Sequence, residues 1–149
     1  MVRRRPFAPS RIRAAWLLPL LIIVLCVAVV PRLIDGYASL QWTRYHAPLG
    51  TSGRRGVEHA RQAVRYAART LELTAPLPWA GEAAQLGLDA SRRVESGDRQ
   101  AALALYGELR AALDQVSAFP LRGLGLGRIA AEARSLETAA AAPQPGAPQ

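Results

Sequence analysis

The sequence predicts an all-α protein built from one N-terminal transmembrane helix and a small helical domain of about four short helices. Two observations lead to this prediction. A long uncharged apolar run lies near the N-terminus, and apolar residues further along recur with the 3.6-residue period of an amphipathic helix. No run alternates with the two-residue period of a strand. The 149 residues are enough for one domain on the usual scale of roughly 100 to 200 residues.

The positive charge of the chain is concentrated at its N-terminus. The formal net charge is +8, and all 19 basic residues are Arg, which indicates a compositional preference for Arg over Lys. Residues 1–13 hold five of them and no acid, whereas the other 14 Arg stand against all 11 acids. This basic segment consists of Arg3, Arg4, Arg5, Arg11 and Arg13. Because the excess is not spread over a folded face, no nucleic-acid partner is expected.

Residues 14–34 are expected to cross the membrane as a helix. The 18 residues from Ala14 to Pro31 carry no charge, and continuation to Ile34 gives 21 residues, or about 31 Å of helix. The five Leu, two Ile and four Val between Ala14 and Pro31 favour insertion by on the order of 3 to 7 kcal/mol. Pro19 is expected to bend this helix mildly. The residues expected to anchor it are Trp16, Leu17, Leu21, Ile23, Val27 and Val30.

Two alternatives to a retained anchor are weaker. A cleaved signal peptide has an apolar region of about 7 to 15 residues followed closely by a small-x-small site, and here the nearest small pair, Gly36 and Ala38, lies beyond a longer run. Lipid attachment at Cys26 would require a small residue before it, where Leu25 stands. A signal anchor is therefore favoured.

The positive-inside rule sets the expected topology. It places the five N-terminal Arg residues in the cytoplasm and the C-terminal domain outside the inner membrane, in the periplasmic or extracytoplasmic space. Trp16 near the inner edge, and Tyr37 with Trp42 near the outer edge, fit the aromatic belts of a membrane protein.

Residues 35–55 are predicted to form a juxtamembrane segment and linker. The anchor helix is expected to continue through Trp42 and Tyr45 and to end at Pro48, because the residue before a proline is biased away from helical angles. The stretch SGRRG at 52–56 supports a flexible connection.

The small helical domain is expected over residues 56–138, and its first helix starts near Val57. One face of this helix is apolar and carries Val57, Ala60, Val64, Ala67, Ala68 and Leu71. The opposite face is charged and carries Glu58, Arg61, Arg65, Arg69 and Glu72. Pairs of opposite charge three residues apart stabilise a helix by only about 0.2 to 0.5 kcal/mol each, so the row of Arg is interpreted as a solvated face.

A second helix is predicted from Pro78 to Ser96, because proline is tolerated in a first turn. Its inner face is almost entirely small, so it is expected to be the central, closely packed helix: Ala80, Ala83, Ala84, Gly87, Ala90, Ser91 and Val94. At the following turn, Gly97 fits a C-terminal cap and Asp98 an N-terminal cap.

The third helix, Arg99 to about Ala118, has the clearest amphipathic pattern, with Ala102, Leu105, Tyr106, Leu109, Ala112, Leu113 and Val116 on one face. A last helix from Leu126 brings Ile129, Ala133 and Leu136 together. The Ala/Pro/Gln tail at 139–149 has little to bury and is expected to be disordered.

The turn at 97–98 and its flanking helices resemble one tetratricopeptide unit. Ala90, Ala102 and Tyr106 match the small, alanine and aromatic positions of that motif, although Leu109 stands where a small residue is expected and no second copy follows at a 34-residue period. The stretches SGDRQAALALYGELRAAL and RIAAEARSLE are also similar to small single-span bacterial membrane proteins of uncharacterised function. The tetratricopeptide resemblance implies a protein-binding role. It predicts an interaction hairpin that includes Ala90, Ala102, Leu105, Tyr106, Leu109 and Leu113.

No enzymatic chemistry is expected. The two histidines, His46 and His59, have no cysteine or acid cluster at metal-ligand spacing, and His59 is interpreted as a surface residue. The glycine-rich RGLGLGR at 122–128 could bind an anion between Arg122 and Arg128, but it lacks the spacing of a phosphate loop and is interpreted as a helix connector. Neither a catalytic residue nor a metal, cofactor or small-molecule substrate is inferred.

The sequence therefore favours a membrane-anchored scaffold or accessory protein that presents a helical protein-interaction domain. Its core is small, which favours a protein partner or self-association. Two alternatives stay open. One is an assembly subunit that acts through its transmembrane helix, with Pro19 and the residues around Ala28 as packing sites; the other is anion binding or enzymatic activity at the glycine-rich loop.

Overall fold

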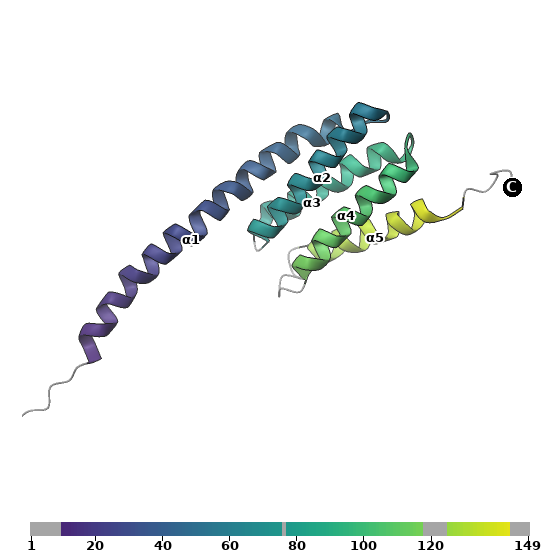
Figure 1. The fold of residues 1–149 in the computed structure, drawn as a ribbon. Helices are drawn as coiled ribbons and strands as arrows, with labels where there is room; N and C mark the ends of the chain where they lie inside the picture. The colour runs from purple at the N-terminus through teal and green to yellow at the C-terminus, as the bar shows by residue number, and fades with distance from the viewer. Residues whose placement is uncertain (1–9, 76, 118–124, 144–149) are drawn as a thin grey trace, which may run out of the picture.

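The computed structural model describes residues 10–75, 77–117 and 125–143, and in these ranges the protein is all-α (Figure 1). The elements in order are α1 (Ser10–His46), the short 3-10 turn η1 (Ala47–Leu49), α2 (Arg54–Thr74), α3 (Pro78–Glu95), α4 (Arg99–Ser117) and α5 (Leu126–Ala141). The all-α class is thus confirmed for the described residues. The four helices α2 to α5 form a bundle, which also includes the C-terminal part of α1.

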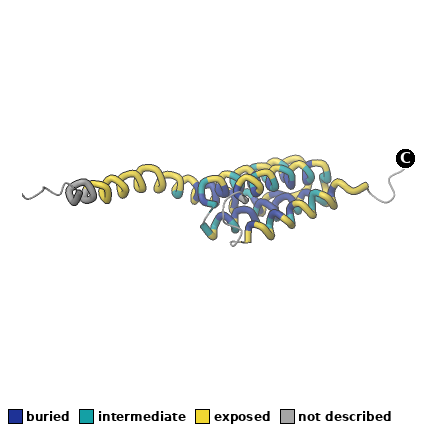
Figure 2. The backbone as a smooth tube through the Cα atoms, turned by 90° about the horizontal axis from the view of Figure 1, so that it is seen from below, coloured by how far each residue is buried: buried dark blue, intermediate teal, exposed yellow. Residues whose placement is uncertain are grey.

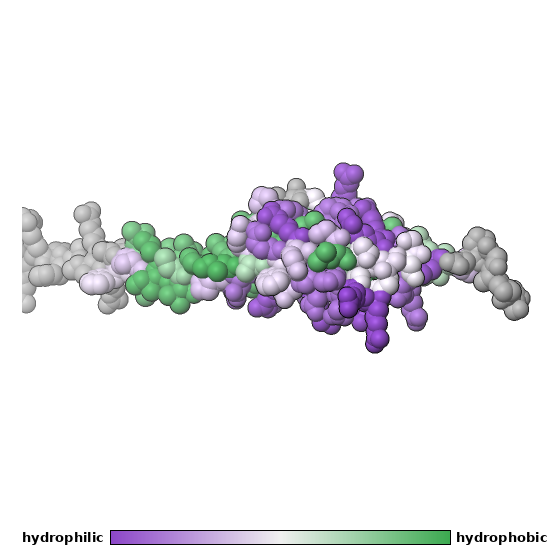
Figure 3. All heavy atoms as spheres, turned by 90° about the horizontal axis from the view of Figure 1, so that it is seen from above, coloured by the Kyte–Doolittle hydropathy of each residue, from purple (hydrophilic) through white to green (hydrophobic). Residues whose placement is uncertain are grey.

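The N-terminal part of α1 projects from the bundle as a single helix and passes through Pro19 and Pro31 without a break (Figures 1 and 2). All six predicted anchor residues are exposed along it, and its surface is almost entirely apolar (Figure 3). Among the described residues, α1 is the one helix long and apolar enough to cross a membrane. Of the five N-terminal Arg residues, Arg11 and Arg13 lie in α1, whereas Arg3, Arg4 and Arg5 lie outside the described residues.

The segment predicted as a linker differs from that expectation, because most of it packs into the bundle. The helix continues through Trp42 and Tyr45 as predicted and gives way to η1 around Pro48. In the last part of this helix, Leu40 and Thr43 are buried against α2 and α3. The close approach depends on small residues: a Cβ atom at Gly36 would collide with Thr74 Cγ2.

Helix α2 therefore buries two faces instead of one. The predicted face is confirmed at Ala60, Val64, Ala67 and Leu71, while Val57 and Ala68 are only partly buried. Packing of α1 buries a second row, Ala63, Thr70 and Thr74. The two threonines satisfy their hydroxyl groups inside the helix, donating to the carbonyl oxygens four residues earlier at 2.8 and 2.7 Å.

Helix α3 is the central helix, as its small face predicts. It contacts α1, α2, α4 and α5, and all seven residues predicted for its inner face are buried. A Cβ atom at Gly87 would lie 3.0 Å from Cβ of Ala67 and 3.5 Å from Cδ1 of Leu109. The absence of a side chain at this position brings α3 against both α2 and α4.

In the turn between α3 and α4, Asp98 caps a helix as predicted, whereas Gly97 has a different role from the predicted one. Asp98 is the predicted N-cap, since its Oδ1 accepts a hydrogen bond from the Ala101 amide at 2.9 Å. Gly97 is predicted to fit the C-terminal cap of α3, but the C-cap is Ser96, and among the described residues only Gly53 and Gly125 have positive φ. The side chain of Ser52 fills the space that a Cβ atom at Gly97 would occupy. Glycine is required here for close packing of the segment that precedes α2.

Helix α5 extends to Ala141, past the predicted domain end at 138. Its C-terminal carbonyl groups are held by Arg99, whose guanidinium donates to the oxygens of Ala139 and Ala142 at 2.8 and 2.6 Å. A cation at a helix C-terminus also interacts favourably with the helix dipole. The first residues of the predicted disordered tail are thus helical, and residues 144–149 lie outside the described residues.

Candidate functional site

The six residues of the predicted interaction hairpin lie in the core. Ala90, Ala102, Leu105, Tyr106, Leu109 and Leu113 are each at most 1% exposed. The Tyr106 hydroxyl donates to Oε2 of Glu95 at 3.3 Å, and burial, together with the Glu95 charge, raises the pKa of Tyr106 so that it remains a donor. These side chains join α3 to α4, and a partner bound to the folded domain would contact other residues.

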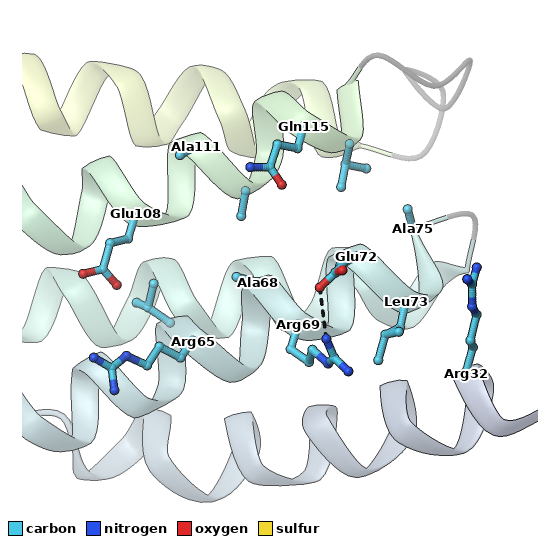
Figure 4. Close-up of a pocket in the computed structure, with 13 residues that line it drawn as sticks. Arg32, Arg65, Ala68, Arg69, Glu72, Leu73, Ala75, Glu108, Ala111 and Gln115 are labelled. Carbon is cyan, nitrogen blue, oxygen red and sulfur yellow. Dashed lines mark hydrogen bonds and ion pairs between the residues drawn. The ribbon is translucent and has the colours of Figure 1, made fainter.

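A groove with a volume of about 960 Å³ lies between α2 and α4 (Figure 4). Its apolar lining comes mainly from the facing sides of these two helices: Val64, Ala68, Leu73, Ala111, Ala112 and Val116, together with Ala75. Val64 and Val116 are buried at its floor, whereas Ala111 is exposed. The residues that line the middle of the groove are mostly alanine. Because their side chains are short, the groove has room for a further helix or chain segment.

Most of the positively charged side chains that border the groove come from α2, and α4 contributes an acidic one. Arg65 and Arg69 come from α2, and Arg32 from α1 lies at the end of the groove occupied by Ala75 (Figure 4). Arg69 pairs with Glu72 at 3.3 Å, but Arg32 and Arg65 form no ion pair with any residue that the structure describes. The α4 side contributes Glu108. The α2 wall is therefore positively charged, and the row of Arg interpreted as solvated forms part of this wall.

The two histidines meet at the opposite end of α2, a contact that the sequence did not predict. Nδ1 of His46 lies 3.0 Å from Nδ1 of His59, and the His46 ring stacks on Trp42 and Tyr66 with centroids 5.8 and 5.9 Å away. One ring must donate its Nδ1–H while the other accepts at a bare nitrogen, so the bond requires at least one neutral histidine. No signal in the sequence predicts the pair, because it forms only when α1 folds back on α2.

The histidine pair predicts that the bundle loses stability as the pH falls. Burial, and then the charge of His59, lowers the pKa of His46. A group whose pKa is lower in the folded state contributes stability that is complete above its unfolded value of about 6.5 and is lost as the pH falls through the folded value. We expect the thermal midpoint to decrease between pH 7.5 and 5.5, and to decrease less in His46→Phe, which cannot titrate. Equal slopes for the two proteins would contradict this role.

The described residues do not support a metal site, and they include only part of the predicted glycine-rich loop. They contain no group of three or more His, Cys, Asp or Glu side chains placed to hold a metal ion. In the predicted glycine-rich loop, Gly125 is the N-cap of α5 with φ of 80° and Arg128 is exposed in its first turn, while Arg122 lies outside the described residues.

No protein-family model matches the chain. Neither the curated proteins nor the solved structures yield a match.

Proposed function

We propose that this protein is a membrane-anchored, non-enzymatic scaffold or accessory protein that docks a protein partner in the groove between α2 and α4. The groove itself is the observation that supports this proposal, since it combines an apolar floor with unpaired charges on a domain carried by an apolar helix. The N-terminus lies in the cytoplasm and the domain lies outside the inner membrane, in keeping with the basic residues that precede the apolar part of α1.

The occupant we propose is an amphipathic helix of the partner. Its apolar face would consist of small or medium side chains, because Ala68, Ala111 and Ala112 leave room between the two walls. Acidic residues would lie on the flank facing α2, where Arg65 has no partner among the described residues. Complementary charge of this kind fixes the direction and register of a bound helix.

Site-specific photocrosslinking in cells tests this proposal. A photoreactive amino acid at Ala111, exposed in the groove, is expected to give a discrete adduct, and the same amino acid at Ala131, exposed on α5, is expected to give none. The double variant Arg65→Glu, Arg69→Glu should lower the adduct yield about tenfold, which corresponds to about 1.4 kcal/mol. Arg93→Glu, a charge reversal on the exposed side of α3, should leave it unchanged.

Mass spectrometry of the adduct identifies the bound segment. A helical segment flanked by acidic residues supports the proposal. Equal adducts at the two alanines, or an adduct insensitive to the charge reversal in α2, would overturn it, and an adduct with a second copy of the chain would reassign the groove to self-association.

A second function, assembly through the transmembrane helix, is favoured by one observation. The apolar part of α1 from Trp16 to Val30 is exposed all around and makes no contact with the bundle in the described residues. Replacing residues 14–34 with an unrelated apolar span separates the two functions. Docking through the groove survives this replacement, whereas assembly through the span is lost.

A further inference from the structure

The bundle is attached to the apolar helix rigidly. Helix α1 is continuous from Ser10 to His46, and its last third packs on α2 and α3. No flexible segment lies between the apolar part, which ends near Ile34, and the packed part, which begins at Gly36. If α1 crosses a bilayer, the position of the bundle relative to that bilayer is therefore fixed.

Contacts along α1 show which end of the bundle lies nearest the apolar part. Gly36 packs directly against Thr74, the last residue of α2. The ring of Tyr37 lies 5.5 Å from the ring of Trp79, in the first turn of α3. At about 1.5 Å per residue, these contacts lie only about 3 to 5 Å beyond Ile34. The His46–His59 pair is on the same scale about 18 Å beyond it.

The side chains at this near end have the chemistry of a membrane interface. Tyr37 is exposed and Trp79 is half-buried beside it, and tyrosine and tryptophan are enriched where headgroups meet hydrocarbon. Arg32 is exposed about 3 Å before Ile34 on the same scale and forms no ion pair within the described residues. Leu73 and Leu77 are partly exposed around the turn that joins α2 to α3. Aromatic, basic and apolar groups together fit a layer of phospholipid headgroups.

We propose that this end of the bundle, formed by Tyr37, Leu73, Leu77, Trp79 and Arg32, rests on the lipid headgroup layer of the bilayer that α1 crosses. The bundle then keeps a fixed orientation on the membrane surface and is not connected to the span by a flexible linker. The groove between α2 and α4 has one end, marked by Arg32 and Ala75, at the lipid surface. This proposal depends on the span of α1 but not on the partner proposed for the groove.

The three tryptophans of the chain allow a direct test, because they differ in their expected depth. Three single-tryptophan variants of the full chain, with the other two replaced by Phe, are reconstituted into phosphatidylcholine and phosphatidylglycerol vesicles containing lipids brominated near the glycerol end of the acyl chains. Trp79 and Trp16 should be quenched at least twice as strongly as Trp42. Along the chain Trp42 is only 8 residues from Ile34 and Trp79 is 45 residues away, so a flexible tether would not give this order.

A second variant keeps the test valid if a substitution perturbs the bundle. Insertion of Gly-Ser-Gly-Ser-Gly-Ser between Ile34 and Asp35 should reduce quenching of Trp79 to the level of Trp42 and leave Trp16 quenched. Quenching of Trp16 without quenching of Trp79 in the uninterrupted chain would overturn the proposal. Absence of quenching at Trp16 would overturn it as well, because the span on which it depends would not be inserted.

Discussion

Replacing Leu109 with aspartate is expected to unfold the bundle of α2 to α5. Leu109 is fully buried and belongs to the main core cluster, and its Cδ1 lies beside Gly87 where α3 and α4 meet. A carboxylate at this position would have no partner, and such burial costs at least about 4 kcal/mol. Because a domain of this size is stabilised by only about 5 to 15 kcal/mol, most of its stability would be lost. Urea titration of the detergent-solubilised protein, followed by circular dichroism at 222 nm, measures the change.

The matched control is Ala104→Asp, on the exposed side of the same helix. It introduces the same charge with a smaller loss of apolar contact and should change the free energy of unfolding by less than about 0.5 kcal/mol. Similar urea midpoints for the two variants would show that Leu109 is not part of a packed core. The sequence predicts Leu109 as a docking residue. If Leu109→Asp unfolds the bundle, a loss of partner binding in this variant is explained by unfolding and not by a lost contact with the partner.

The sequence predicts the core faces of α3 and α4 well because both depend on local periodicity. Ala80, Gly87 and Val94 of α3, and Leu105 and Leu113 of α4, recur at helical spacing and are all buried. Periodicity identifies a face that must be covered. It does not distinguish a face covered by the same chain from one covered by a partner. For this reason the sequence predicts an interaction surface at the hairpin residues, although the bundle itself covers them.

The packing of α1 on α2 could not be predicted in this way. The segment after the span contains glycines and a proline, which favour a linker, and its buried residues Ser39, Leu40 and Thr43 form no long amphipathic pattern. Only the three-dimensional arrangement shows that Gly36 allows the close approach of α2. The His46–His59 pair depends on this same approach, so it was missed for the same reason.

The sequence patterns of the lining residues do not reveal the groove, since Ala68 and Ala112 fall on apolar faces that the periodicity predicts as core. Ala68, Ala111 and Ala112 are small residues on helix flanks, and Arg65 belongs to a charged row typical of solvated surfaces. Their significance arises because α2 and α4 lie side by side while α3 packs against both. A hollow between two helices depends on their separation, which the sequence of either helix does not determine.

Substituting leucine for Gly36 is expected to displace α1 from the bundle. Any Cβ atom here collides with Cγ2 of Thr74, and Leu73 Cβ lies 3.5 Å from the same position, so the added side chain has no space. Overpacking costs about 1 to 3 kcal/mol, which outweighs the gain of about 0.8 kcal/mol in helix propensity over glycine. The urea midpoint should fall, and quenching of Trp79 by brominated lipids should fall with it, since both depend on α1 holding the bundle at a fixed height. Ala38→Leu, on the exposed side of the same turn, adds an equivalent side chain and should alter neither measurement. If the Gly36 variant kept the wild-type midpoint and quenching, the contact between α1 and α2 would not orient the bundle.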